Sequence, residues 1–489
     1  MAKEWVIRGV PPGLSRDMWW MTAAEDVPPP PPQGQRARGL GETGGRAGAL
    51  VVLVALADWL FFGHALGLSL ALFSGAVLAV VMLASPGRER LRPALLLLVT
   101  ALPVVEHVQA LSLVFLGPGL LVSLVWASAG REALAGHAFR LVQELPLRGV
   151  RDGIGLGSQV VKSETLRDHR RHLRGWAFPL GGALVLSALL IEANPVLGEL
   201  ALRLARLDIG VETVERLLFW TGATLLIWPL IAPLPEAGDF RLRLPMPKGP
   251  SAGSVARGLV VFNTILGVQT VMDAAYLWGG AALPEGMTAA EYAHRGAYPL
   301  LVTALLAGAF ALAARPFAAE DRRLRGLLLL WLTQNVALVL SALMRLELYV
   351  DAFGLTYLRV HAAIWMMLVA AGLGLTAWQV WQGLPNRWLL LRSVALAAGT
   401  LYACCFVNFA AVIAKENLSR PERLDAVYVC ALGPLAAAEI AAADVRLPCW
   451  PGRPRIDGWR DWGFRDWRVS RYLATMPVAE GVHEDPRGG

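Results

Sequence analysis

Long apolar runs alternate with short arginine-rich stretches along most of this chain. The first two runs, residues 47–83 and 93–129, are each far longer than the roughly 20 residues that one transmembrane helix needs. Small and polar residues interrupt each run, at 63–67 and at 106–109. We therefore predict four spans in this region, arranged as two helical hairpins.

Shorter apolar runs predict seven more spans. Gly354 fits the C-terminal cap of one of them, and Thr356 fits the N-cap of the next. Thr288, with Glu291 three residues later, predicts a short helix before one span, and residues 197–208 predict an amphipathic helix at the interface. The seven expected spans are 176–191, 217–231, 256–278, 299–314, 326–353, 357–381 and 389–414.

The distribution of Lys and Arg orients these spans. Cytoplasmic loops of membrane proteins carry an excess of both residues, and with eleven crossings the basic connections all fall on one side. We predict an all-α, polytopic transmembrane helical bundle with a cytoplasmic N-terminus and a C-terminal tail outside. Its expected parts are a disordered Pro- and Gly-rich cytoplasmic tail (1–46), four spans (47–129), a basic cytoplasmic loop (130–175), a seven-span domain (176–414) and a partly helical exported tail (415–489).

Composition agrees with a chain that lies largely in lipid. Of its 489 residues 55% are hydrophobic and only 17% are charged, whereas soluble domains average about a quarter charged. The net charge of +7 follows from the basic cytoplasmic loops, for which anionic lipid headgroups are the counter-charge. Membrane lipids are thus the expected partners and no nucleic acid is implied. A protein partner would use the tail or the 130–175 loop.

Motifs for soluble chemistry are weak. Gly153, Gly155 and Gly157 follow a Gly-x-Gly-x-Gly spacing, which differs from the dinucleotide-binding pattern and has no expected strand before it. These glycines therefore predict a flexible connection. The eight His residues are scattered, and no His-Glu-x-x-His or Cys-x-x-Cys motif occurs. No catalytic residue, metal or cofactor is expected.

Ionisable side chains within or near spans are costly and therefore mark candidate sites. The residues of one such cluster fall near the outer ends of the spans between 256 and 381: Gln269, Asp273, Tyr276, Arg345, Glu347, Asp351, Arg359 and His361. We hypothesise that they line an outward-facing pocket. Arg345 and Arg359 would contact a lipid headgroup or an anionic solute, and Asp273 and Glu347 would hold the arginines in place. In the alternative interpretation, these groups satisfy one another and fix helix ends at the interface.

Five stretches resemble the bacterial integral-membrane family catalogued as domain of unknown function 4173, a relative of the 4153 group. They are DAAYLWGGAALPEGMTAAEYAHRGAYPLL (273–301), LELYVDAFGLTYLRVHAAIWM (346–366), LYACCFVNFAAVIAKEN (401–417), LDAVYVCALGP (424–434) and DWRVSRY (466–472). The resemblance implies a multi-pass protein of the bacterial inner membrane. It implies no established activity and supplies no catalytic residue.

Three classes of function stay open. A non-enzymatic envelope protein that binds lipid or a partner is favoured over a transporter of a small polar or anionic solute and over an enzyme acting on a lipid-linked substrate. A water-filled cavity reaching mid-bilayer would favour transport, a lateral cleft would favour lipid chemistry, and a filled interior would favour a scaffold. In the exported tail, Cys430 and Cys449 either form a disulfide or stay as free thiols, because spacing alone does not fix pairing.

Overall fold

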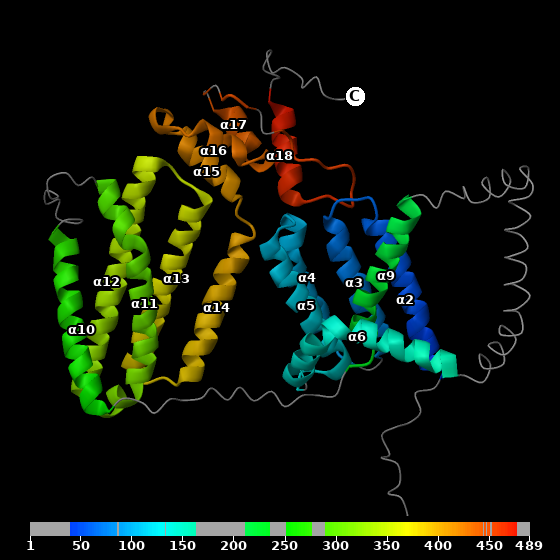
Figure 1. The fold of residues 1–489 in the computed structure, drawn as a ribbon, viewed down its shortest axis with the longest axis horizontal. Coiled ribbons are helices and arrows are strands. Elements are labelled where there is room, and N and C mark those ends of the chain that lie inside the picture. The colour runs from blue at the N-terminus through cyan, green and yellow to red at the C-terminus, as the bar shows by residue number, and fades with distance from the viewer. Residues whose placement is uncertain are drawn as a thin grey trace, which may run out of the picture. The chain divides into compact units, whose positions relative to one another are not determined.

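The computed structural model describes residues 40–85, 88–132, 134–162, 211–234, 251–275, 289–443, 445, 447–449 and 452–476. Every regular element within these ranges is a helix, which confirms the all-α prediction (Figure 1). Among the described residues, five helices are long and apolar enough to cross a membrane, and a sixth crossing follows if the bent pair formed by α14 and α15 is one span. The predicted span 176–191 and the interfacial helix 197–208 lie outside the described residues.

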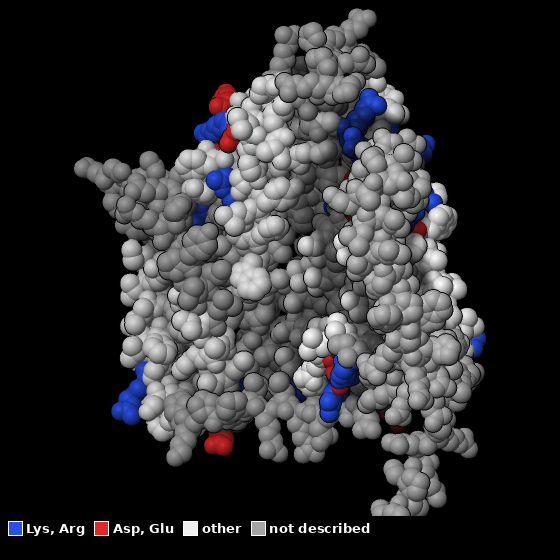
Figure 2. All heavy atoms as spheres, turned by 45° about the vertical axis from the view of Figure 1, so that its right-hand side comes forward, with Lys and Arg blue, Asp and Glu red and all other residues white. Residues whose placement is uncertain are grey.

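Apolar side chains cover the outward faces of these helices. Leu226 is 71% exposed, Val271 69% and Leu358 68%. Figure 2 shows few charged side chains among the described residues, scattered between uncharged ones. Large apolar surfaces of this kind are rare on soluble monomers and are expected where a helix faces lipid.

The chain divides into two compact units, residues 1–58 with 147–233 and residues 59–146 with 234–489. The first unit holds most of α2 (Leu40–Phe61), the end of α6 (Leu134–Lys162) and α9 (Val211–Ile231). Asp58 near the end of α2 joins it to α9, because its Oδ1 accepts a hydrogen bond from Trp220 Nε1 at 2.9 Å and lies 3.2 Å from Arg216 Nε. Asp152 of α6 accepts from Trp228 Nε1 at 3.1 Å.

Helix α6 corrects the prediction of a flexible connection at the glycines within the basic loop 130–175. It is continuous through Gly153, Gly155 and Gly157. Its apolar residues recur at helical spacing, and Leu141 and the largely buried Arg148 pack inward. That amphipathic pattern overrides the cost of about 1 kcal/mol that a glycine adds within a helix. Residues 163–175 of the predicted loop lie outside the described residues.

In the second unit, α3 (Leu68–Ala84), α4 (Leu91–Glu106) and α5 (Ala110–Ala129) pack together. The breaks before α3 and between α4 and α5 fall where the two hairpin turns were predicted. With 17 and 16 residues, α3 and α4 are short for a full crossing of roughly 20 residues. A Cβ on Gly119 would clash with the side chain of Thr100, so the absence of a side chain there lets α4 and α5 approach closely.

Five more helices of this unit stand side by side in Figure 1. They are α10 (Ala252–Asp273), α11 (Ala289–Glu320), α12 (Arg322–Phe353), α13 (Tyr357–Gln382) and α14 (Asn386–Cys404). A buried apolar core, which includes Leu259, Leu328 and Leu373, joins the first four. Both predicted helix caps are confirmed. Gly354 ends α12 with φ of +76°. Thr356 caps the start of α13, where its Oγ1 accepts a hydrogen bond from Arg359 N.

Two boundaries in this unit differ from the prediction. Helix α11 is one element of 32 residues. The predictions of a separate short helix before the span and of a span that ends at residue 314 were therefore wrong. Arg315 lies within α11 and donates to Asn386 Oδ1 at 2.8 Å. The predicted span 389–414 is bent by 68° between α14 and α15 (Phe409–Leu418). Asn408 at this bend caps α15 by accepting from Ala411 N at 3.2 Å.

After the bend, short helices make a compact C-terminal segment. They are η2 (Pro421–Arg423), α16 (Ala426–Ala431), η3 (Pro434–Ala436), α17 (Ala437–Ala442) and α18 (Phe464–Thr475). Figure 1 draws α15 to α18 at one end of the second unit's long helices. Cys430 and Cys449 form a disulfide with Cα atoms 6.0 Å apart, which ties α16 to the connection before α18.

Candidate functional site

The turn between α12 and α13 is built by a small set of local contacts. Gly354 has φ of +76°, and a Cβ at this position would lie 2.8 Å from Asn417 Oδ1, so both the backbone conformation and the space favour glycine. Asn417 on α15 accepts from Leu355 N at 2.6 Å and donates to Leu355 O at 2.9 Å. This reciprocal pair fixes α15 against the turn.

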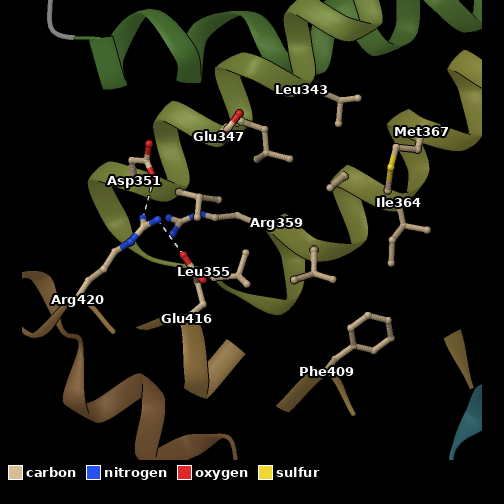
Figure 3. Close-up of a pocket in the computed structure, with 14 residues that line it drawn as sticks. Leu343, Glu347, Asp351, Leu355, Arg359, Ile364, Met367, Phe409, Glu416 and Arg420 are labelled. Carbon is tan, nitrogen blue, oxygen red and sulfur yellow. Dashed lines mark hydrogen bonds and ion pairs between the residues drawn. The ribbon is translucent and has the colours of Figure 1, made fainter. Parts of the chain in front are cut away.

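A pocket of about 390 Å³ lies beside this turn, between α12, α13 and α15 (Figure 3). One part of its wall is apolar and the other carries five ionisable side chains. Its apolar residues are Leu343, Leu346, Val350, Leu355, Val360, Ala363, Ile364, Met367 and Phe409, and its ionisable residues are Glu347, Asp351, Arg359, Glu416 and Arg420. We call the five ionisable residues the charged rim.

Arg420 is the most heavily paired member of the charged rim. Its Nη1 lies 2.7 Å from Asp351 Oδ1, and its Nη2 lies 2.8 Å from Glu416 Oε1. Figure 3 draws this arginine between the two carboxylates. Arg423 donates to the main-chain oxygen of Asp351 at 2.6 Å. These contacts hold the C-terminal end of α12 to the segment that follows α15.

Arg359, by contrast, is held by the main chain. Its Nη1 donates to the main-chain oxygens of Phe353, at 2.8 Å, and of Gly354. Its guanidinium carbon lies 4.5 Å from the centre of the Tyr349 ring. Cations are favourable at a helix C-terminus, where carbonyl groups lack partners within the helix. Arg359 therefore caps α12 from the first turn of α13.

The predicted cluster divides into two groups. Glu347, Asp351 and Arg359 line the pocket, whereas Asp273 and Arg345 form an ion pair between α10 and α12 and are absent from its lining. Asp273 Oδ1 lies 2.5 Å from Arg345 Nη2, with the side chains 2% and 5% exposed.

The other predicted members lie nearby. Gln269 Nε2 donates to Asp273 Oδ1 at 2.9 Å, so Gln269 belongs with the ion pair. His361 is exposed and has ring contacts of 6.2 Å with Tyr357 and with Phe409; it does not line the pocket. Tyr276 lies outside the described residues.

Two rim residues, Glu416 and Arg420, were missed by sequence reasoning. They stand at i and i+4 and form an ion pair, with Glu416 on α15 and Arg420 two residues after its end. Because the span was expected to run straight to residue 414, both were placed in the tail, away from the cluster. The signal that could have found them is Asn408, a good N-cap residue six residues before the end of that expected span.

Residues 249–253 also match the Gly-x-Ser-x-Gly pattern of a nucleophile elbow, a match that sequence reasoning missed. An elbow requires a strand before the serine and a helix after it. Here Ser251 is the N-cap of α10, and its Oγ accepts from Ser254 N at 3.3 Å. In the described structure Ser251 therefore has a capping role.

A second polar cluster joins the C-terminal segment to the helical hairpins. Arg465 of α18 is 2% exposed; its Nε donates to Glu106 Oε1 at 3.1 Å and its Nη2 to Cys405 O at 2.5 Å. His107 Nδ1 lies 2.9 Å from Asp466 Oδ2. Leu68 N donates to Trp462 O at 2.9 Å. The C-terminal segment is thus held against both predicted hairpin turns.

The family model described as "Domain of unknown function (DUF4153)" matches residues 47–443. This range covers most of the chain, so the chain belongs to that family. The match confirms the 4153 group that was named as a relative in the sequence resemblance. The more specific assignment to the 4173 family is not confirmed. The matched range contains every residue of the pocket, while α18 lies beyond it. No curated protein and no solved structure matches the chain.

Proposed function

We propose that this DUF4153-family chain is a non-enzymatic, multi-pass protein of the bacterial inner membrane that binds a membrane lipid in the pocket between α12, α13 and α15. The observation that carries the proposal is the division of the pocket into an apolar wall and a charged rim. A lipid has the same division along its length, with a polar headgroup and an apolar chain.

The dimensions of the pocket support this ligand class. Its lining on α13 runs from Arg359 to Met367, which at 1.5 Å per residue is roughly 12 Å along the helix axis. That length is close to half of a hydrocarbon core of about 30 Å. An acyl chain that lies along this wall exchanges contacts with other lipid tails for contacts with apolar side chains, which are about equally apolar, while the rim fixes the headgroup.

The position of the pocket favours binding over transport. It lies at one end of α12 and α13, and its described lining ends at apolar residues, Leu343 and Met367. A transport path requires polar groups that continue across the bilayer.

An enzyme would need an activated nucleophile or base with an orienting partner. In the charged rim, Asp351 and Glu416 pair with Arg420, and Arg359 binds main-chain oxygens. Glu347 has no described residue that would orient it as a base.

Substitution at Leu346 tests the binding function. Leu346→Trp places a larger side chain on the pocket wall and is expected to lower the amount of lipid retained on the purified protein by at least about fivefold, because overfilling a site of this size excludes a chain. Native mass spectrometry of the protein extracted in a mild detergent measures the retained lipid. Leu348→Trp, two residues along α12 and outside the pocket, is the matched control and should retain lipid normally.

If both variants were folded and both retained lipid normally, the pocket would not be the binding site. Loss of lipid from both would point instead to a general effect of tryptophan on α12. Only a loss confined to Leu346→Trp supports the proposal.

We also propose that the chain crosses the membrane eleven times, with the charged rim and the C-terminal segment outside the cytoplasm. Contacts of this segment with Leu68, Glu106 and Tyr357 support the placement of these three turns and the tail on one side of the membrane. A phosphatase active only outside the cytoplasm, fused after Gly489, is expected to be active. A fluorescent protein that matures only in the cytosol, fused there, would be bright if the orientation were reversed.

A further inference from the structure

The charged rim holds more negative than positive charge. Three carboxylates, of Glu347, Asp351 and Glu416, face two guanidinium groups, of Arg359 and Arg420. With all five ionised, the rim carries a net charge of −1. An anionic headgroup would add to that excess, whereas a group with a positive charge would offset it.

The contacts within the rim show which groups remain available. Arg420 is shared between two carboxylates, so Asp351 and Glu416 already have a cationic partner. Arg359 uses Nη1 for two main-chain oxygens, which leaves its other guanidinium N–H groups for a ligand. Glu347 has no hydrogen bond or ion pair with any residue that the structure describes.

The place of Glu347 strengthens the case for a cationic ligand group. It lies one helical turn from Asp351 and one turn from Leu343 on α12, so it stands between the polar and apolar parts of the same wall (Figure 3). Glu347 is exposed, so its carboxylate is accessible to a ligand from outside the protein. A bound ammonium group would supply a counter-charge and donate hydrogen bonds to the carboxylate.

We infer that the pocket selects a lipid whose headgroup carries both a primary ammonium and a phosphate, the phosphatidylethanolamine class. The ammonium pairs with Glu347, and the phosphate accepts from the free N–H groups of Arg359, while the acyl chain follows the apolar wall. This inference rests on the proposed lipid-binding function. The sequence predicted that Arg345 would contact the headgroup. Because Arg345 is buried in its pair with Asp273, Arg359 alone is assigned that role.

Titration of the purified full chain with three phospholipids of identical acyl chains tests the selection. Phosphatidylethanolamine is expected to bind about tenfold more tightly than phosphatidylglycerol, which has no ammonium. It should also bind more tightly than phosphatidylcholine, whose quaternary ammonium cannot donate a hydrogen bond. Glu347→Gln should abolish the preference for phosphatidylethanolamine while total binding persists. Glu320→Gln, an exposed change at the end of α11, is the control and should keep the preference.

The outcomes separate the two proposals. If none of the three lipids binds, the lipid-binding function itself fails. If all bind equally, if phosphatidylglycerol binds best, or if Glu347→Gln keeps the wild-type preference, the headgroup assignment fails and lipid binding stands. A preference for phosphatidylethanolamine that depends on Glu347 supports both.

Discussion

Replacing Arg465 with alanine is expected to release the C-terminal segment and to lower the free energy of unfolding by about 3–5 kcal/mol. Arg465 is buried between Glu106 and the main-chain oxygen of Cys405. Its removal leaves the carboxylate of Glu106, 8% exposed, without its cationic partner, and a buried unpaired charge is far more costly than a lost surface contact. The protein purified in detergent should show a clearly lower Tm and faster proteolysis within residues 452–476.

Arg468→Ala is the matched control for this experiment. Arg468 lies on the same helix, is exposed, and contacts the Phe464 ring at 5.6 Å. Exposed substitutions of this kind change stability by about 0.5 kcal/mol or less, so its Tm should match that of the unaltered chain. If Arg465→Ala behaved like Arg468→Ala, the docking of α18 would not depend on the buried pair.

Local signals in the sequence predicted much of the fold. The glycines and polar residues at 63–67 and 106–109 interrupt apolar runs, and the structure breaks its helices there. The backbone of Gly354 and the side chain of Thr356 act within a few residues, and both caps occur as predicted. Such features depend on the chain nearby, so one sequence is enough to recognise them.

Features that depend on distant partners were missed. The bend after α14 falls in an apolar stretch that lacks proline and glycine, and it is stabilised by Asn408, which donates to Leu435 O at 2.9 Å in the segment that follows. Arg465 and Glu106 are 359 residues apart in the chain. Asn408 is recognisable locally as an N-cap residue, but nothing local marks the two long-range contacts, because each is favourable only after the C-terminal segment has folded back.

The candidate site shows the same division. Sequence position placed Glu347, Asp351 and Arg359 near one helix end, and all three line the pocket. The same reasoning added Asp273 and Arg345 to the pocket, because it could place residues at a similar depth but could not fix which face of each helix meets a neighbour. In the structure α10 meets α12 on the face that carries the two charges, so they bind each other.

Replacing Arg345 alone is the second change with a large expected effect. Arg345→Met leaves Asp273 buried between α10 and α12 with Gln269 as its described hydrogen-bond donor. Breaking one side of a buried ion pair typically costs about 3–5 kcal/mol. We expect a correspondingly lower Tm in detergent. Arg322→Met, an exposed change in the first turn of α12, is the control and should leave the Tm unchanged.

The double variant Asp273→Leu, Arg345→Met separates a structural role from a role in binding. Burying each charge costs desolvation energy, and this cost disappears when both charges are removed. Replacement of a buried ion pair by apolar residues is therefore often neutral or stabilising. We expect the double variant to recover most of the stability lost in Arg345→Met and to bind phosphatidylethanolamine with unchanged affinity, because neither residue lines the pocket. If the double variant were stable yet lost its lipid, Arg345 would belong to the binding site, as the sequence first suggested.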